Sequence, residues 1–333
     1  MASQYFKRSK TMKPPVDPIL IHLGPNFGIH WYGLLIVTGV LLGAIYASWR
    51  ARMDGENPDH VWNGLVAAII LAIIGARLYH VFSEPRGGMI GWSYYRENPK
   101  EILYIWQGGL GIYGAIIGGI LGVGLYAWYA RLRPLRWLDY GAPGLALGQF
   151  VGRWGNFVNQ ELYGPPTNRP WGLIIDPAHR IAPYNDLTKY PPDTLFHPTF
   201  LYESLWCLLL FIVLAVTAHK LKDRLVEGDI LLGYIIGYST GRFFIEYFRP
   251  DAWMIGPIAA AQFFALILIA VGVVAIVLRH TILRPDGVAT LTTAATSPAS
   301  ECESVEETVE KTKGTEEADA EGATATTQGD LSS

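Results

Sequence analysis

Long apolar runs divide the sequence into segments that predict membrane-spanning helices. A helix needs about 20 predominantly apolar residues to cross the hydrocarbon core of a bilayer. The fourth run is the weakest, because it contains glycines together with Pro143, Gln149 and Arg153. The predicted spans cover residues 31–49, 61–82, 110–129, 137–157, 200–218, 230–248 and 257–278. The pattern therefore predicts an all-α polytopic membrane protein with seven transmembrane helices.

Two segments lie outside these runs and differ from each other. Residues 159–199 form a proline-rich connection whose Trp, Tyr and Ile content favours a small folded extracytoplasmic head. Residues 284–333 are rich in Ala, Thr, Glu and Gly, which predicts a disordered acidic tail that catalysis does not need, with an acidic docking tail as the alternative. We therefore expect an N-terminal tail over 1–28, a seven-helix domain over 29–283 and a C-terminal tail over 284–333.

The short connections predict the orientation of the chain. Basic residues follow the first, third, fifth and seventh runs: Arg50, Arg52, Arg131, Arg133, Arg136, Lys220, Lys222, Arg224, Arg279 and Arg284. The positive-inside rule makes this side cytoplasmic, with the N-terminus outside and the C-terminus inside. The basic N-terminal stretch KRSKTMK opposes this assignment, but the four consistent segments outweigh it. A cleavable signal peptide is the alternative to the first span, although that run is long for one.

Composition narrows the class of protein. Hydrophobic residues make up 50% of the chain and charged residues 17%, against about 25% charged in soluble domains. The net charge of −3 gives no reason to expect a nucleic-acid partner. Cys207 lies in an apolar run and Cys302 in the tail, so a disulfide framework is not expected. No His/Cys/Asp cluster in the sequence predicts a metal.

Polar side chains from several predicted spans gather near the extracytoplasmic ends. Arg153 lies within about one turn of the outer end of the fourth span, and Arg242 about two turns below the end of the sixth. An ionised residue at such depth costs about 2.5–3.5 kcal/mol to insert and marks a functional site by default. The other candidates at this level are Tyr32, Arg77, Tyr113, His197, Tyr202, Glu203, Glu246 and Arg249.

Several of these residues have a structural alternative. Arg249 stands at a span end and can snorkel to the interface, and Arg77 can belong to a structural ion pair. Arg242 and Glu246 lie at i and i+4, on one helix face, and can neutralise each other. His197 can be a hydrogen-bonding loop residue.

Arg153 lies in the stretch GRWGNFVNQELYG, residues 152–164. The local sequence offers it no close acid, since Glu161 is eight residues on, so a bound anion is the more economical partner. At headgroup depth this anion is a lipid phosphate, which two guanidiniums can bracket with paired hydrogen bonds. The same stretch supplies amides that can orient headgroup hydroxyls and glycines that allow close approach: Asn156, Asn159, Gly152, Gly155 and Gly164.

This stretch resembles, position by position, the signature G-R-x-G-N-F-[aliphatic]-N-x-E-x-x-G of bacterial prolipoprotein diacylglyceryl transferases. HWYGL, GARLYHV, HPTFLYES and GRFFIEYFRPD resemble further blocks of that family, over residues 20–282. The resemblance implies transfer of the diacylglyceryl group of phosphatidylglycerol to the lipobox cysteine of a prolipoprotein, recognised through its signal peptide, with release of glycerol phosphate. It also implies a seven-helix protein of the bacterial cell membrane and no cofactor.

The resemblance also implies roles for single residues. Arg242 takes the place of an essential sixth-span arginine, Arg249 that of the arginine after it, and Tyr32 that of a conserved tyrosine. Tyr113 stands where some members have a histidine considered as a catalytic base; with an ordinary pKa near 10, a tyrosine is the poorer base unless nearby arginines lower its pKa. The catalytic candidates are thus Arg153, Arg242 and Tyr113. Headgroup-binding and architectural roles fall on Arg153, Asn156, Asn159, Glu161 and Gly164, with support from Arg77, His197, Tyr202, Glu203 and Glu246.

A transporter or lipid scramblase that uses the same arginines as a transient anion site is the rival class. No internal repeat supports it, and its substrate path should reach both faces, whereas the polar residues gather on one. A third alternative, a purely structural membrane scaffold, would not explain why the charged Arg153 lies in an apolar run.

Overall fold

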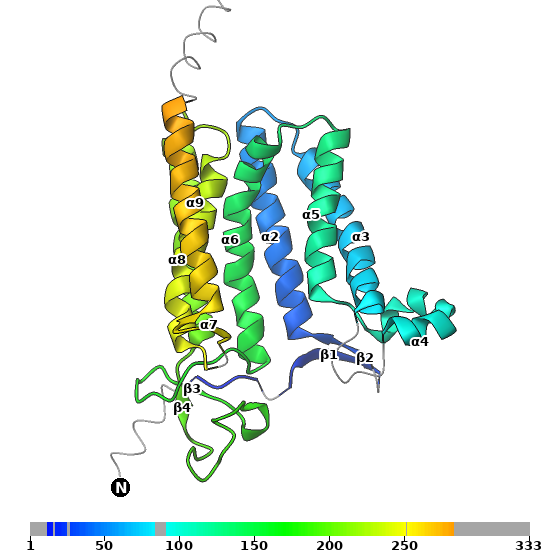
Figure 1. Cartoon of the computed structure of the whole chain (residues 1–333), viewed down its shortest axis with the longest axis vertical. Helices are drawn as coiled ribbons and strands as arrows, with labels where there is room; N and C mark the ends of the chain where they lie inside the picture. Colours follow the sequence, from blue (N-terminus) through cyan, green and yellow to red (C-terminus); the bar gives the residue numbers. More distant parts are fainter. Residues whose placement is uncertain (1–11, 16, 25–26, 84–90, 251, 283–333) are drawn as a thin grey trace, which may run out of the picture. The chain divides into compact units, whose positions relative to one another are not determined.

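Long helices make up most of the structure (Figure 1). The computed structural model describes residues 12–15, 17–24, 27–83, 91–250 and 252–282. The predicted disordered tail and most of the N-terminal basic stretch lie outside these residues. Each predicted apolar run coincides with one long helix in the described part of the chain: α2 (Trp31–Met53), α3 (Asp59–Phe82), α5 (Ile112–Tyr129), α6 (Pro134–Val158), α7 (Thr199–Lys220), α8 (Asp229–Ile245) and α9 (Ala260–Ile282).

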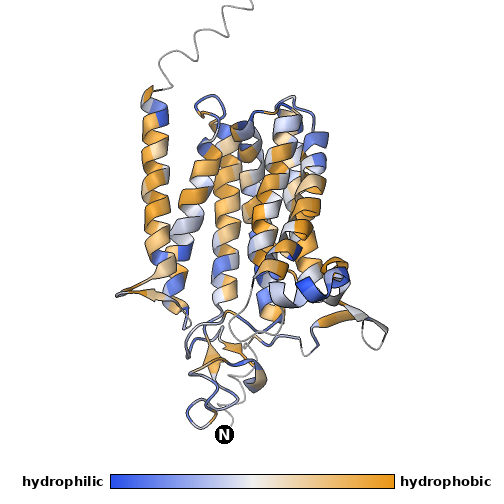
Figure 2. Cartoon of the chain, turned by 45° about the vertical axis from the view of Figure 1, so that its right-hand side comes forward, coloured by the Kyte–Doolittle hydropathy of each residue, from blue (hydrophilic) through white to orange (hydrophobic). Residues whose placement is uncertain are grey.

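The exposed helix surfaces are apolar. Figure 2 shows hydrophobic residues along the helices and hydrophilic residues mainly at their ends and in the loops. Among the described residues, five helices are long and apolar enough to cross a membrane: α2, α3, α5, α7 and α9. Helix α8 has only 17 residues before a short 3-10 turn, η5 (Glu246–Phe248), continues it. Helix α6 carries Asp139, Gln149 and Arg153 among its apolar residues.

Glycines allow two pairs of helices to approach closely. Helix α3 packs against α5, where a Cβ on Gly114 or Gly118 would overlap a backbone carbonyl of α3, and one on Gly122 would lie 2.5 Å from the Ala67 carbonyl oxygen. Helix α2 packs against α6 in the same way, and a Cβ on Gly43 would lie 2.7 Å from the Gly144 carbonyl oxygen. Small residues at such spacing let helix backbones meet where lipid gives no hydrophobic drive to associate.

Helices α6, α7 and α8 form a third set of contacts. Asp139 of α6 accepts hydrogen bonds from the backbone N–H groups of Gly228 (2.5 Å) and Leu231 (2.8 Å), and so caps the start of α8. Trp206 of α7 lies against Gly241 and donates its indole N–H to the Gly237 carbonyl (2.9 Å). These contacts hold the three helices that carry the polar cluster described below.

Short elements connect the long helices, and the apolar pattern did not predict them. An antiparallel hairpin, β1 (Ile19–Gly24) and β2 (Phe27–His30), leads into α2, within and just after the segment expected to be a tail. Between α3 and α5 lie α4 (Trp92–Glu97), η2 (Pro99–Leu103) and η3 (Ile105–Gln107). A second hairpin, β5 (Met254–Ile255) and β6 (Ile258–Ala259), joins α8 to α9.

The connection from α6 to α7 folds around its own hydrophobic cluster. Its elements are β3 (Leu173–Ile174), η4 (Pro177–His179) and β4 (Leu195–Phe196), with β3 and β4 antiparallel. The buried members of the cluster are Tyr163, Leu173, Ile175, Tyr184, Phe196 and Phe200. Arg180 is buried beside them and donates hydrogen bonds to the carbonyls of Ile175, Tyr190, Pro191 and Pro192. Met12 pairs with Leu173, so the N-terminal segment adds a strand-like contact to this region.

Candidate functional site

The signature stretch forms a tight reversal at the end of α6. Gln160 and Leu162 both adopt the left-handed backbone region with φ of 55°, which is uncommon for residues other than glycine. The reversal lets the backbone N–H of Glu161 donate to the Asn156 carbonyl (3.0 Å). The Glu161 carboxylate then accepts from the side-chain amides of Asn156 (2.8 Å) and Asn159 (3.4 Å). The two asparagines and the glutamate of the signature therefore hold one another in place.

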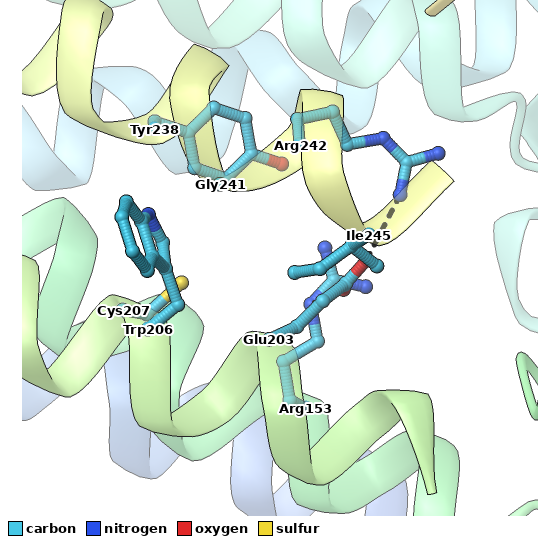
Figure 3. A pocket seen from close by; sticks show the side chains of 8 residues that line it. All are labelled: Arg153, Glu203, Trp206, Cys207, Tyr238, Gly241, Arg242 and Ile245. Atoms are coloured by element: carbon cyan, nitrogen blue, oxygen red, sulfur yellow. Dashed lines mark hydrogen bonds and ion pairs between the residues drawn. The ribbon is translucent and has the colours of Figure 1, made fainter. Parts of the chain in front are cut away.

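A cluster of two arginines and two glutamates joins α6, α7 and α8. Glu203 of α7 bridges two guanidiniums, with 2.5 Å from its Oε2 to Nε of Arg153 and 2.9 Å from its Oε1 to Nη1 of Arg242. Arg242 also reaches Glu246, with 2.6 Å from Nη2 to Oε2. Figure 3 shows Arg153 and Arg242 approaching Glu203 from different helices. The paired charges lie in a largely enclosed position, because Glu203 is only 7% exposed and Glu246 6%.

The local sequence offers Arg153 no close acid, but the folded chain supplies one. Its partner is Glu203, which is remote in sequence and close only because α6 packs against α7. The reversal does bring Glu161 back toward α6, but Glu161 binds Asn156 instead of Arg153. The i, i+4 pair of Arg242 and Glu246 forms as the structural alternative supposed, yet Arg242 at the same time contacts Glu203.

The cluster forms part of the wall of a small cavity. The cavity is lined by Arg153, Glu203, Trp206, Cys207, Tyr238, Gly241, Arg242 and Ile245 (Figure 3). Its free volume is about 10 Å³, which is about what a single water needs. Sequence reasoning missed Trp206, Cys207 and Tyr238. Helical spacing could have found two of them, since Cys207 follows Glu203 by four residues and Tyr238 precedes Arg242 by four.

Two further signature positions are explained by close packing. A Cβ on Gly155 would lie 2.5 Å from the Tyr32 ring, so the glycine lets this tyrosine of α2 lie directly on α6. A Cβ on Gly164 would lie 2.9 Å from the His197 Cβ, and the Gly164 N–H donates to the His197 carbonyl (2.9 Å). Tyr32 and His197 thus contact the two ends of the signature stretch.

His197 lies in a hydrogen-bonded row of aromatic side chains. Its Nδ1 lies 3.0 Å from the Tyr202 hydroxyl, and the oxygen of that hydroxyl accepts a hydrogen bond from the indole N–H of Trp171 (3.0 Å). Burial, together with the charge of Arg169, lowers the pKa of His197 below its ordinary value. The imidazole is therefore neutral near pH 7 and able to accept a proton.

The stability of this protein should fall as the pH drops below about 6.5, and His197 should be one cause. The pKa of His197 is lowered in the folded chain from an ordinary value of 6.5, so in acid the unfolded chain binds a proton that the folded chain does not. Stability is complete above the unfolded pKa and is lost as the pH falls toward the folded pKa. Melting temperatures between about pH 7.5 and pH 5.5 should therefore depend less on pH in His197→Gln.

A matched control for this measurement is His179→Gln, because His179 is an exposed histidine of the same connection. That variant should keep the wild-type pH dependence. Identical slopes for His197→Gln and wild type would contradict the prediction.

Tyr113 and Arg77 lie on the other helix pair. Tyr113, at the start of α5, is 63% exposed and its ring packs against Tyr79 of α3. Arg77 is buried and donates hydrogen bonds to the carbonyls of Glu101 (2.5 Å), Ile102 (2.8 Å), Gly108 (2.9 Å) and Gly109 (3.0 Å). Arg77 therefore holds the connection before α5 through backbone carbonyls, and no described contact joins Tyr113 to the arginine–glutamate cluster.

Arg249 follows η5, and its backbone N–H donates to the Glu246 carbonyl (3.1 Å). The residue is half-buried. Arg249 is therefore close in sequence to Glu246 of the cluster and lies where α8 and its 3-10 extension end.

A larger cavity of about 190 Å³ lies where α2 and α6 meet the connection between α7 and α8. Its charged lining is balanced: Arg50, Arg136 and Lys222 face Asp54, Asp139 and Glu227. Arg50 pairs with Asp54 (2.8 Å), and Asp139 is occupied by the start of α8. This cavity offers no pair of arginines that share one acid, unlike the cluster at Glu203.

These features define a helical membrane protein in which two arginines and two glutamates meet between three helices. The family model described as prolipoprotein diacylglyceryl transferase matches residues 18–278. The chain belongs to the prolipoprotein diacylglyceryl transferase family, as the signature stretch predicted.

Individual relatives agree with the family match. A phosphatidylglycerol–prolipoprotein diacylglyceryl transferase of Chloroflexus aggregans is 44% identical, over 82% of this chain and 96% of the relative. A protein of the same name from a Nostoc species is 41% identical, across 80% of this chain and 91% of the relative. Another from Streptococcus uberis is 38% identical, across 80% of this chain and 96% of the relative. The match to a family of transferases supports an enzyme and gives no support to the transporter alternative.

Proposed function

We propose that this protein transfers the diacylglyceryl group of phosphatidylglycerol to the lipobox cysteine thiol of a prolipoprotein. The family match, the relatives' names and the convergence of Arg153 and Arg242 on one oxyanion, the carboxylate of Glu203, support this function. Guanidiniums aimed at a shared point from two helices suit a phosphate, because each can offer it paired donors.

The chemistry requires one bond to form and one to break. The lipobox thiolate attacks the glycerol carbon that carries the phosphate ester, and a carbon–sulfur bond forms. The carbon–oxygen bond breaks, its electron pair stays on the phosphate, and glycerol phosphate leaves. Arg153 and Arg242 would stabilise the negative charge that grows on the leaving phosphate. Binding lipid and peptide together would supply the remaining acceleration through proximity, and this reaction needs no cofactor.

The thiol proton must leave before or during attack, since the thiolate is the nucleophile. His197 is a candidate acceptor, because its lowered pKa keeps the imidazole neutral. Asn156, Asn159 and Glu161 would shape the headgroup site as one hydrogen-bonded unit. The other family positions, Tyr32, Gly164 and Arg249, would border it, and Tyr202 would orient His197.

The proposed topology has seven spans, in which α6 and α8 join the five helices that are long and apolar enough to cross a membrane. The N-terminal tail 1–28 would lie outside the cell membrane, and so would the extracytoplasmic head formed by the folded connection 159–199. The seven-helix domain would cover residues 29–283, and the tail 284–333 would be cytoplasmic. The site would then face the outer half of the bilayer, where signal peptides of prolipoproteins emerge.

Purified protein incubated with phosphatidylglycerol and a lipobox peptide tests the function. Mass spectrometry should show the peptide with a diacylglyceryl group on its cysteine, and glycerol phosphate should be released in equal amount. A peptide with serine in place of the cysteine is the control and should gain no mass. An unmodified cysteine peptide, with folded protein and lipid present, would refute the proposal.

Tyr113→Phe should lower turnover about tenfold at most, the equivalent of one hydrogen bond. The phenol is a weak base, and its ring lies against Tyr79 on the other helix pair. The pH dependence of turnover at saturating lipid, measured for this variant and wild type, checks the prediction. A loss of about a thousandfold together with one limb of the profile would instead make Tyr113 the base.

A further inference from the structure

Glu203 occupies the position that the proposed function assigns to a phosphate. Each oxygen of its carboxylate serves a different guanidinium, Arg153 on one side and Arg242 on the other. A phosphate group would bind the same two side chains through two of its oxygens. The carboxylate thus makes the hydrogen bonds that a headgroup phosphate would make, with the same sign of charge.

The cavity beside the two arginines is too small for a second anion. Its free volume of about 10 Å³ holds about one water molecule, whereas a phosphate group has five heavy atoms. A phosphate can enter this cavity only if a side chain moves. Glu203 is the side chain that occupies both guanidiniums.

Charge also selects Glu203 as the group that moves. Arg153 and Arg242 balance Glu203 and Glu246, so the four side chains together are neutral. An additional anion beside a carboxylate would meet like-charge repulsion, which is strong where water is scarce. Glu203 lies in the second turn of α7, close to the helix start at Thr199. Rotation of its side chain toward that end would relieve the repulsion.

We propose that the Glu203 carboxylate is an internal stand-in for the substrate phosphate, which exchanges with the headgroup in each catalytic cycle. The inference rests on the proposed function and adds a positioning residue to it. With no lipid bound, Glu203 keeps the two guanidiniums paired and aimed at one point. After transfer it returns to them and helps to expel glycerol phosphate, because both anions compete for the same donors.

Glu203→Gln separates this role from a merely structural one. Loss of the competing charge should lower the inhibition constant of glycerol phosphate by about tenfold or more, since like charges close together cost several kcal/mol. The KM for phosphatidylglycerol should fall together with this inhibition constant. The turnover number should fall as well, because product release slows. A structural defect would reduce turnover without tighter binding of the phosphate product.

Glu246→Gln is the matched control. It also removes one carboxylate from Arg242, but Glu246 has no ion pair with Arg153 among the described residues. The inhibition constant of Glu246→Gln should fall less than that of Glu203→Gln, because Glu246 pairs with Arg242 alone whereas Glu203 pairs with both arginines. Inorganic phosphate, tested beside glycerol phosphate, shows whether the exchange requires the glycerol portion.

The outcomes separate the two proposals. An active wild type with an unchanged inhibition constant in folded Glu203→Gln would overturn the stand-in role and leave the function intact. A wild type that forms no adduct would instead remove the function itself. If Glu203→Gln does not fold, infrared difference spectra of the wild type provide an independent test. Saturating glycerol phosphate should shift the absorption band of a carboxylate in these spectra. The absence of any shift would also overturn the inference.

Discussion

Arg153→Lys should reduce turnover by about 100-fold or more, although the positive charge is kept. Removing one donor that stabilises transition-state charge costs about 10²–10³ in turnover in other enzymes. Arg153 makes two interactions at once: its Nε forms an ion pair with Glu203 (2.5 Å), and its Nη1 donates a hydrogen bond to the Asn156 side chain (3.5 Å). An ammonium group is a single point of charge without this planar arrangement of donors.

Initial rates of adduct formation at saturating lipid measure this effect, with melting temperatures to show that the variant folds. Arg133→Lys is the matched control, because the Arg133 side chain is 72% exposed and pairs with Glu227. It should turn over at the wild-type rate. Near-normal turnover in Arg153→Lys would instead favour an interface anchor, since lysine snorkels as well as arginine.

Gly118→Leu should have the largest effect on stability, a loss of about 3 kcal/mol or more. A Cβ at this position of α5 would overlap the Leu71 carbonyl of α3, and backbone cannot rotate out of the way as a side chain can. The two helices would have to separate along their whole contact, which would also disturb the segment that Arg77 holds. Thermal unfolding in detergent, followed by the fraction of protein that stays soluble, measures the loss.

Gly124→Leu on the same helix is the control. A Cβ on Gly124 meets nothing within 4 Å, and the residue is exposed on the apolar surface. This variant should unfold at or slightly above the wild-type temperature, because leucine favours helix more than glycine does. Equal stabilities for the two variants would show that Gly118 does not set the distance between α3 and α5.

The positions of the long helices were largely predictable. An apolar run of sufficient length forms a helix in lipid because its backbone must satisfy its own hydrogen bonds, and each predicted run coincides with such a helix. The segment between α3 and α5 was not predicted. Its turns are short, and Arg77, which is remote in sequence, binds backbone carbonyls within and after them.

The charged members of the candidate site were predictable from the sequence, but their contacts were not. A charged residue inside an apolar run stands out, so Arg153 and Arg242 were recognisable. Their shared partner was not, because Glu203 meets them only through the packing of α7 against α6 and α8. Tyr113 lies at the start of the third long helix, α5, as predicted, but its ring packs against Tyr79 of α3, which the sequence did not predict.

The sequence by itself determined the environment, the helices and the family, since apolar length and a thirteen-residue signature are local properties that need no folded chain. Only the tertiary structure decided which charges neutralise which. An ion pair forms only where the nitrogen and oxygen atoms come within about 4 Å of each other, so the pairing depends on how α6, α7 and α8 are packed. That packing brings Arg153 and Arg242 to one shared carboxylate, that of Glu203, and leaves room for about one water beside it.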